Sequence, residues 1–409
     1  MKLILVQPFG HRNGHYSFET WRLANTLLEK NLKLQIISFD GFIDKNESEI
    51  KESGFKHVSF AKNAGFFKKL IVRGVIRFLS LINYNRLISR WISIVETYFT
   101  LQLANEVYQN EDQDLIFCYD GELVGFLLYC ANTNKKKIVH GRLEYGRTLS
   151  SNNVGRKVKR SIENWLCKKA INKNSIKFIY HVQNLEKSYE NTGFLGECIH
   201  IPLFGIEESI KVIDKTEARN FLNLPKDITI LLVFGIGHPG KNYETIVKAI
   251  KNLNGNCCVV FAGSSLPVND AKYLSKKYNV EENTIIFDKY IPKPEHGYYF
   301  YSADYLLLSY KKEFVLDSGV LIEAIRYGVP VIASDAAWIG EMVETNGLGT
   351  TFTSEDPESL ESAINKSLLL NEDEIEKIRT NMKELANKNS WENVIEKHLE
   401  IFQDTVEAA

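Results

Sequence analysis

Short apolar runs that alternate with amphipathic helical patterns restrict the fold of this chain more than any other feature. Seven such runs lie in the first half, at residues 2–6, 33–39, 57–60, 114–119, 136–140, 176–182 and 198–202. Five more follow, at residues 228–235, 257–262, 284–287, 305–309 and 329–333. Runs of this length are typical of buried parallel strands joined by helical crossovers. The pattern predicts an α/β fold with doubly wound parallel sheets.

The length and the strand pattern together predict more than one domain. A chain of 409 residues exceeds the roughly 250–300 residues at which single hydrophobic cores stop growing. The strand pattern pauses over residues 203–216, a mixed and charged segment suited to a linker. We therefore expect two Rossmann-like domains, at residues 1–205 and 206–388. Residues 359–370, 373–388 and 391–405 predict three terminal helices.

Composition places the chain among ordinary globular proteins. It is 44% hydrophobic and 25% charged, which excludes a disordered tail or a fibrous protein. The six cysteines show no C-x-x-C spacing and are expected to be free, buried thiols. The N-terminal apolar run is too short for a signal peptide, and no run of 18 apolar residues occurs. We expect a cytoplasmic protein without a transmembrane helix.

Charge is unevenly distributed, with 29 Lys and Arg against 19 Asp and Glu in residues 1–200. Between residues 62 and 90 there are seven basic residues and no acidic one, and residues 66–90 interleave them with apolar side chains at helical spacing. This pattern is typical of an interfacial helix on an anionic membrane surface, where each cation contributes about 1 kcal/mol. A core-packed helix with a basic solvated face is the alternative. No nucleic-acid partner is expected, because no helix-turn-helix, zinc-ligand or RNP pattern accompanies the charge.

A glycine-rich loop follows the first apolar run of the second half. Residues 235–240 read G-x-G-x-x-G, but a dinucleotide site also requires an acidic residue about 20 positions on. Residues 260–263 are Val-Phe-Ala-Gly, so an NAD-dependent oxidoreductase is disfavoured. Lys241 ends the loop just before a predicted helix, where the helix dipole and the ammonium both favour a diphosphate. A solvated lysine on a tight turn is the alternative.

A second segment carries a family resemblance. Residues 313–324, continuing through 328–335, resemble family 4 retaining glycosyltransferases of the GT-B fold, also described as glycosyl transferases group 1. In that family a helix with a glutamate precedes a small-Gly-x-Pro-Val strand, and a G-x-x-R-P-x-K loop lies upstream. Residues 234–241 fit this loop with His238 in the arginine position. The resemblance implies two Rossmann-like domains facing a central cleft, with residues 389–409 forming a helix that returns to the N-terminal domain.

The resemblance also implies roles for residues of the second domain. Glu323 would accept hydrogen bonds from ribose hydroxyls, as suits an ionised carboxylate. Lys241 would neutralise the leaving diphosphate, aided by His238 when it is protonated. The family's first glutamate is Val315 here, which leaves Glu313, expected to be catalytic, and Asp317 as alternatives. The expected donor-binding set is Gly237, His238, Lys241, Asp317, Ser318, Gly319 and Glu323.

Matches in the first half are looser. The segment from residue 10 to residue 16 is similar to the family's glycine-containing loop between acceptor and donor, which implies acceptor-binding roles for Gly14 and His15. A predicted strand ends at His140, where the family keeps a histidine against the transferred sugar, so His140 is a candidate catalytic residue. Arg142 would contact the acceptor. A structural role is the alternative for both histidines, and a solvent-exposed position for Arg142.

The expected function follows from this resemblance. A nucleoside-diphosphate sugar would act as co-substrate, with no other cofactor, and its sugar would pass with retention to a glycan or lipid-linked acceptor. Surface polysaccharide or lipopolysaccharide synthesis is the expected process, at the inner face of the plasma membrane. No metal site is expected, because no paired-aspartate motif or cysteine cluster occurs. A catalytically degenerate GT-B protein that binds nucleotide or a membrane partner is the alternative, ahead of an oxidoreductase.

Overall fold

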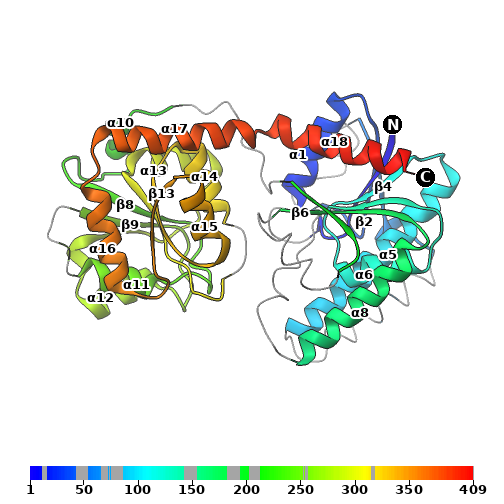
Figure 1. The fold of residues 1–409 in the computed structure, drawn as a ribbon, viewed down its shortest axis with the longest axis horizontal. Coiled ribbons are helices and arrows are strands. Elements are labelled where there is room, and N and C mark those ends of the chain that lie inside the picture. The colour runs from blue at the N-terminus through cyan, green and yellow to red at the C-terminus, as the bar shows by residue number, and fades with distance from the viewer. Residues whose placement is uncertain are drawn as a thin grey trace. The chain divides into compact units, whose positions relative to one another are not determined.

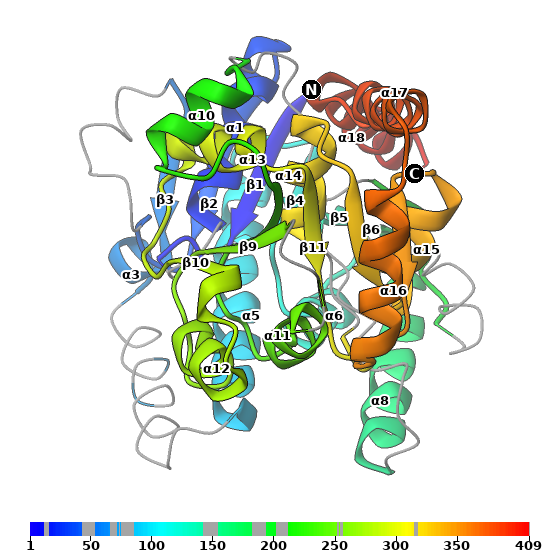
Figure 2. The ribbon, with the colours of Figure 1, turned by 90° about the vertical axis from the view of Figure 1, so that its left-hand side faces the viewer.

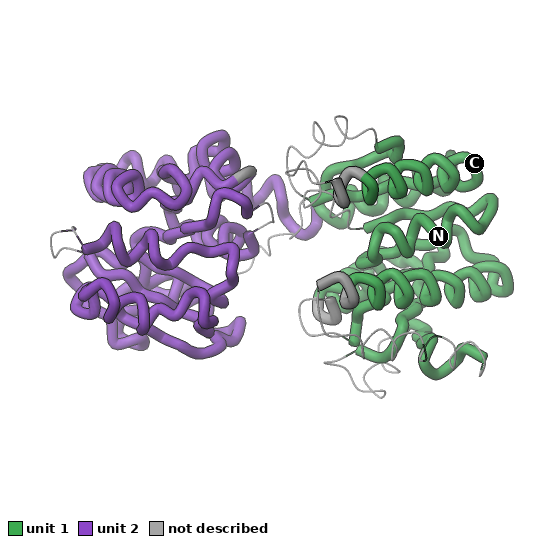
Figure 3. The backbone as a smooth tube through the Cα atoms, turned by 90° about the horizontal axis from the view of Figure 1, so that it is seen from below, with its two compact units in different colours: residues 1–203, 394–409 green, residues 204–393 purple. Residues whose placement is uncertain are grey.

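The protein has two compact units, each built on one parallel sheet. The computed structural model describes residues 1–11, 16–42, 54–65, 72, 74, 86–141, 154–181, 194–201, 212–251, 253, 257–314 and 318–408. Residues 1–203 and 394–409 form the first unit, and residues 204–393 form the second (Figure 3). The expected linker at residues 203–216 lies largely outside the described residues.

The sheet of the first unit has seven strands in the order β3-β2-β1-β4-β5-β6-β7. Neighbouring strands pair in parallel, and the order reverses between β1 and β4. All seven strands predicted for this half are confirmed. They are β1 (Lys2–Gln7), β2 (Lys33–Ser38), β3 (Lys56–Ser59), β4 (Leu115–Cys118), β5 (Lys137–His140), β6 (Ser175–Tyr180) and β7 (Glu197–His200).

Helices cover both faces of the first sheet (Figure 1). On one face α5 (Arg86–Asn110), α6 (Leu123–Ala131) and α8 (Val154–Ile171) bury alternate strand residues such as Ile4, Ile116 and Ile138. The other face carries α1 (Tyr16–Glu29) and α18 (Trp391–Glu407), where the ring of Phe402 lies 4.8 Å from that of Phe117. The short helix α3 (Phe60–Asn63) follows β3. The C-terminal helix therefore packs on the N-terminal sheet.

The second sheet has six strands in the order β10-β9-β8-β11-β12-β13, again all parallel. Its order reverses between β8 and β11, which makes this the switch point where ligands of such sheets bind. Five strands match the predicted runs, whereas β13 was not predicted. The strands are β8 (Thr229–Phe234), β9 (Cys257–Ala262), β10 (Thr284–Phe287), β11 (Tyr305–Leu308), β12 (Val331–Ser334) and β13 (Gly349–Phe352).

The helices of the second unit form two layers (Figures 1 and 2). The helices of one layer, α11 (Tyr243–Ile250), α12 (Ala271–Tyr278) and α16 (Pro357–Leu368), share the core beneath the sheet. The other layer contains α10 (Lys215–Phe221), α13 (His296–Ser302), α14 (Gly319–Tyr327) and α17 (Glu372–Lys388). Helix α15 (Ala337–Thr345) contacts β12 and β13, and the 3-10 turns are Glu281–Asn283 and Lys293–Glu295.

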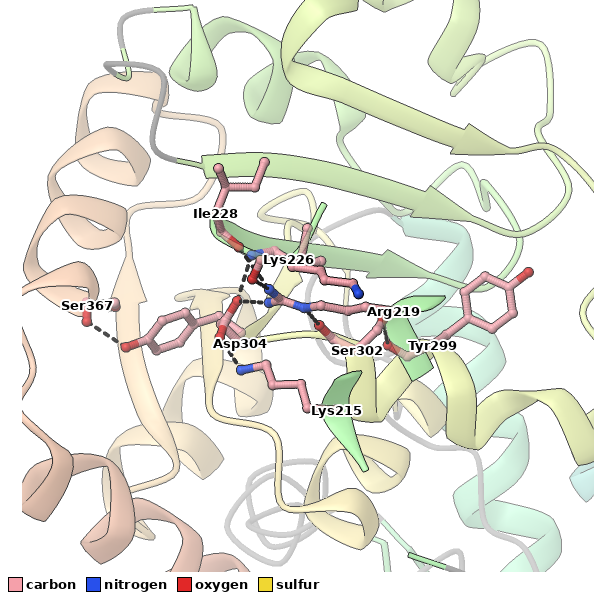
Figure 4. A network of polar contacts seen from close by, with 10 residues as sticks. Lys215, Arg219, Lys226, Ile228, Tyr299, Ser302, Asp304 and Ser367 are labelled. Atoms are coloured by element: carbon pink, nitrogen blue, oxygen red, sulfur yellow. Dashed lines mark hydrogen bonds and ion pairs between the residues drawn. The ribbon is translucent and has the colours of Figure 1, made fainter. Parts of the chain in front are cut away.

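A buried arginine fixes the amino edge of the second sheet (Figure 4). Arg219, on α10, is 5% exposed and donates to Asp304 Oδ2 at 2.7 Å. Its guanidinium also donates to the carbonyls of Ser302, Lys226 and Ile228 at 3.0, 2.6 and 3.2 Å. Asp304 further accepts the Ile230 amide at 2.7 Å and pairs with Lys215. This network joins α10 to the starts of β8 and β11.

Candidate functional site

Lys241 lies at the opposite, carboxyl edge of the second sheet, in the loop between β8 and α11. The residue is 6% exposed, and its Nζ donates to the Phe234 carbonyl at 2.6 Å. Burial lowers the pKa of this ammonium to about 7. A Cβ atom on Gly235 would lie 3.5 Å from Lys241 Nζ and 3.4 Å from Val320 Cγ2, in the first turn of α14. The cation therefore lies beside the glycine loop and the start of α14.

One buried amide holds the loop in place. Asn269 is 3% exposed, and its Nδ2 donates to the carbonyls of His238 at 2.8 Å and Lys241 at 3.1 Å. Its Oδ1 accepts the Tyr243 amide at 3.1 Å, which ties the loop to the first turn of α11. A Cβ on Gly237 would lie 2.9 Å from the Asn269 carbonyl oxygen. Gly237 is therefore required for the packing of this loop.

The loops after β8 and β9 meet backbone to backbone. Gly235 has a φ of +85° and Gly263 a φ of +143°, conformations that favour glycine. A Cβ on Gly263 would lie 2.3 Å from the Gly235 carbonyl oxygen. Glycine at both positions thus allows the close approach that brings Lys241 to the strand end.

His238 has a structural contact within the same loop. Its Nδ1 accepts the Gly240 amide at 3.0 Å, so the neutral ring carries its proton on Nε2. The ring lies 6.2 Å from that of Phe314. While this hydrogen bond is kept, Nε2 is the ring nitrogen that can donate to a ligand.

The start of α14 brings two expected donor-site residues to this edge. Ser318 caps the helix through its Oγ, which accepts the Leu321 amide at 3.3 Å, and Gly319 is the first helical residue. The Ser318 hydroxyl also lies 2.9 Å from the Tyr310 hydroxyl, and the Tyr310 ring stacks on Phe314 at 4.2 Å. Glu313, in the preceding turn, is exposed.

Glu323 lies one turn further along α14, with its side chain 22% exposed. Its Oε2 is 3.6 Å from His296 Nδ1, and its Oε1 is 3.7 Å from Arg326 NH1. The His296 ring packs edge-on against Phe234 at 4.8 Å, the residue whose carbonyl accepts from Lys241. Lys241 and Glu323 are thus both linked to Phe234 at the end of β8, Lys241 directly and Glu323 through His296.

Sequence reasoning missed His296 and Asn269. The Nε2 of His296 lies 3.2 Å from the Ile291 carbonyl, so the neutral ring turns an unprotonated Nδ1 towards the Glu323 carboxylate. Nδ1 and the carboxylate oxygen are then both acceptors. A hydrogen bond at this place requires a proton, either on Nδ1 in the imidazolium form or from the hydroxyl of a ligand. The sequence around each residue carries no motif for these contacts, because they form only where loops from distant parts of the chain meet.

His140 is packed inside the first unit. It is 0% exposed, its Nε2 lies 3.0 Å from the Gly121 carbonyl, and its ring stands edge-on to Phe126 at 4.7 Å. Burial lowers its pKa to about 4, so the ring is neutral near pH 7. It ends β5 at the carboxyl edge of the first sheet. In the described part of the unit it acts as a hydrogen-bonded core histidine.

The same edge carries further polar side chains. Gln7, at the end of β1, donates through Nε2 to Thr20 at 2.8 Å and to Asp120 at 3.3 Å. His11 Nε2 lies 3.5 Å from the buried carboxylate of Glu96. The contact between Gln7 and Asp120 follows from the topology, which brings the ends of β1 and β4 together.

Several expected residues lie outside the described part of the chain. They are Gly14, His15, Arg142 and Asp317, together with most of the expected membrane helix at residues 66–90. Among the described residues, no cluster of three His, Cys, Asp or Glu side chains could hold a metal ion. In the same residues, no helix has the length and apolarity needed to span a membrane.

Comparison with known proteins identifies the fold and a family match. Residues 214–389, most of the second unit, match the model of the family Glycosyl transferases group 1. The lipopolysaccharide 1,2-N-acetylglucosaminetransferase of Salmonella typhimurium is 26% identical over 272 residues, 64% of this chain and 70% of the relative. A glycosyltransferase structure from Rickettsia africae has a TM-score of 0.72 at 15% identity, covering 100% of this chain and 99% of the other.

A third match is the Anabaena protein HepE, whose structure was determined in complex with UDP and glucose. Its TM-score is 0.66 at 15% identity, covering 100% of this chain and 99% of the other. Together with the two parallel sheets, these neighbours show the GT-B glycosyltransferase fold, which confirms the predicted fold class.

Proposed function

We propose that this protein is a retaining glycosyltransferase that uses a nucleoside-diphosphate sugar as donor. The observation that carries the proposal is the buried Lys241 ammonium, which has a neutral carbonyl as its hydrogen-bond partner and lies at the switch point of a parallel sheet. A buried cation is costly unless an anion pairs with it. The diphosphate of the donor would supply that anion.

Residues around Lys241 complete a donor site in this proposal. The amides at the start of α14, capped by Ser318, would bind the phosphates together with Lys241. Glu323 would accept hydrogen bonds from the ribose hydroxyls, one of which would donate into the space between Glu323 and His296. The UDP complex of the GT-B neighbour HepE supports a nucleotide of this class.

The reaction would proceed on one face of the sugar. The bond between the anomeric carbon and the diphosphate oxygen breaks, the acceptor hydroxyl forms a new bond to that carbon, and its proton passes to the departing phosphate oxygen. Lys241 stabilises the growing charge on the diphosphate more in the transition state than in the ground state. In this scheme the protein supplies the positive charge without a metal ion.

The proposed acceptor is a glycan or lipid-linked glycan of a surface polysaccharide or lipopolysaccharide. The name of the Salmonella relative supports this class of acceptor. The carboxyl edge of the first sheet, with Gln7, Asp120 and His140, is the proposed acceptor side, since ligands of parallel sheets bind beyond the strand ends.

Calorimetric titration with UDP, GDP, ADP and TDP tests the donor site directly. We expect one nucleotide to bind more tightly than the others and Lys241→Ala to weaken its binding by about tenfold or more, roughly 1.4 kcal/mol. Lys248→Ala, at an exposed lysine of α11, the helix that follows the Lys241 loop, is the matched control and should leave affinity unchanged. Nucleotide affinity that does not respond to Lys241→Ala would contradict the proposal. Binding without sugar transfer to any glycan acceptor would favour a degenerate GT-B protein.

A further inference from the structure

Helix α8 exposes a row of large apolar side chains. Val158, Ile162 and Trp165 are 54, 48 and 61% exposed. Their spacing of four and three residues places them on one side of the helix. The opposite side, with Leu166, Cys167 and Ala170, is buried in the core shared with α6. The helix is therefore apolar on two opposite sides, and packing within the first unit explains one of them.

All charged residues of α8 except Glu163 are basic. The helix carries six basic residues, Arg156, Lys157, Lys159, Arg160, Lys168 and Lys169. Its single acidic residue, Glu163, is 1% exposed and lies 2.8 Å from Lys159 Nζ, so it adds no negative charge to the surface. Lys168 and Lys169 are exposed beside the apolar row, and Lys169 Nζ lies 5.4 Å from the centre of the Trp165 ring.

We propose that α8 docks the protein on an anionic membrane surface. Val158, Ile162 and Trp165 would enter the boundary between headgroups and acyl chains, and the lysines would contact lipid phosphates. Tryptophan suits this boundary because its ring is apolar and its indole N–H is polar. An amphipathic helix with basic residues beside an apolar row is what such surfaces bind. This inference does not depend on the proposed donor site.

A nucleic acid fits this surface less well. Affinity for nucleic acid comes mainly from Lys and Arg contacts with phosphates, which leaves an exposed row of Val, Ile and Trp unexplained. The surface also differs from the membrane helix expected from sequence at residues 66–90. The proposed surface lies on α8. The structure is needed to find it, because the sequence of α8 does not tell which of its apolar residues are buried and which are exposed.

Helix α12 of the second unit provides a matched control. Its Tyr273 is 61% exposed, as Trp165 is, and the neighbouring Lys272 and Lys276 are exposed as well. Its other apolar side chains, Leu274 among them, face the core rather than extending a row from Tyr273. An exposed aromatic residue between lysines is thus present in both helices, and the apolar row is present only in α8.

Co-sedimentation of the full chain with lipid vesicles tests the proposal. We expect binding to phosphatidylcholine vesicles containing phosphatidylglycerol, and binding weaker by about tenfold or more without the anionic lipid. The double variants W165S/I162S and K168E/K169E should each weaken binding by about tenfold or more. The controls Y273S and K272E/K276E should leave it unchanged. Brominated lipids should quench tryptophan emission in the wild type, and W165F should remove that quenching.

Three results would overturn the inference. The first is vesicle binding that neither α8 double variant reduces. The second is binding of duplex DNA or RNA that K168E/K169E abolishes, with no binding to vesicles. The third is a concentration-dependent dimer that W165S/I162S dissociates, again without vesicle binding, which would assign the row to a second copy of the chain. Circular dichroism verifies folding, and because the substituted side chains are exposed, the variants should fold as the wild type does.

Discussion

Two cations are buried in the described part of the second unit, and their surroundings differ. Arg219, at the amino edge of the sheet, makes four hydrogen bonds and pairs with the carboxylate of Asp304. Lys241, at the carboxyl edge, donates to one neutral carbonyl, and burial lowers its pKa to about 7. Among the described residues, one buried charge is thus paired with a carboxylate and the other has no anionic partner. The difference is between a cation that holds the fold together and one that, under the proposed function, awaits the diphosphate of the donor.

The largest expected effect comes from removing the partner of the satisfied cation. Asp304→Ala leaves Arg219 buried without a counter-charge and should lower the free energy of unfolding by about 3–5 kcal/mol. Urea unfolding, together with hydrogen exchange of the β8 and β11 amides, would measure the loss. Lys215→Ala is the control, because Lys215 pairs with the same carboxylate but is 44% exposed, so its loss should cost about 0–1 kcal/mol. Equal effects of the two variants would show that Asp304 is not the residue that compensates the buried charge of Arg219.

At Lys241 we expect a loss of activity without a loss of stability. Lys241→Met should reduce the rate of sugar transfer by roughly 100- to 1,000-fold, about 2.7–4 kcal/mol of transition-state stabilisation. The free energy of unfolding should stay the same or rise, since an apolar side chain replaces a buried cation that has no ionic partner among the described residues. Transfer assays and urea unfolding of the same preparation measure both quantities, with Lys248→Met as control. A fall in stability comparable to that of Asp304→Ala would show that Lys241 is a structural residue.

The contrast between the two cations also shows what sequence could and could not predict. Twelve strands were predicted correctly, most of them because a strand buried on both faces is a continuous apolar run. Strand β13, Gly-Thr-Thr-Phe, was missed because it is short, mostly polar and at the edge of the sheet. The pair of Arg219 and Asp304 has no local signal, since 85 residues separate its members.

Lys241 and Glu323 could be singled out because each belongs to a loop or helix pattern with a recognisable order of residue types. His296 and Asn269 could not, because their positions depend on how loops from different strands meet. His140 was identified from its place at a strand end, but its complete burial follows from packing around Gly121 and Phe126 that the sequence does not show.

A smaller effect is expected at the carboxylate of Glu323. Glu323→Gln should weaken binding of the preferred nucleoside diphosphate by about 1.5–3 kcal/mol, the contribution of hydrogen bonds to a charged group. Pyrophosphate has no ribose, so its affinity should be unchanged. Glu376→Gln, at an exposed position on α17, is the matched control. If pyrophosphate binding fell equally, Glu323 would act on the phosphate site and not on the ribose.

The smallest expected effect is a pH dependence of nucleotide affinity that arises from Lys241. In the folded protein its pKa of about 7 lies below the ordinary value of 10.5. Below pH 7 the buried lysine is charged, and its burial lowers the free energy of unfolding by the full amount. This loss of stability disappears as the pH rises from about 7 towards 10.5. A diphosphate prefers the ammonium form. Nucleotide affinity should therefore fall above pH 7, approaching about tenfold per pH unit, with about one proton taken up on binding at pH 8.

Calorimetry at pH 8 in two buffers of different ionisation enthalpy would measure that proton uptake. Lys241→Arg is the informative variant, because a guanidinium stays charged throughout this range. It should bind nucleotide without proton uptake and with an affinity that is flat between pH 7 and 9. If the arginine variant kept the wild-type pH dependence, the titrating group would be another residue of the loop, with His238 the first to examine, and Lys241 would not be the cation that the donor's diphosphate neutralises.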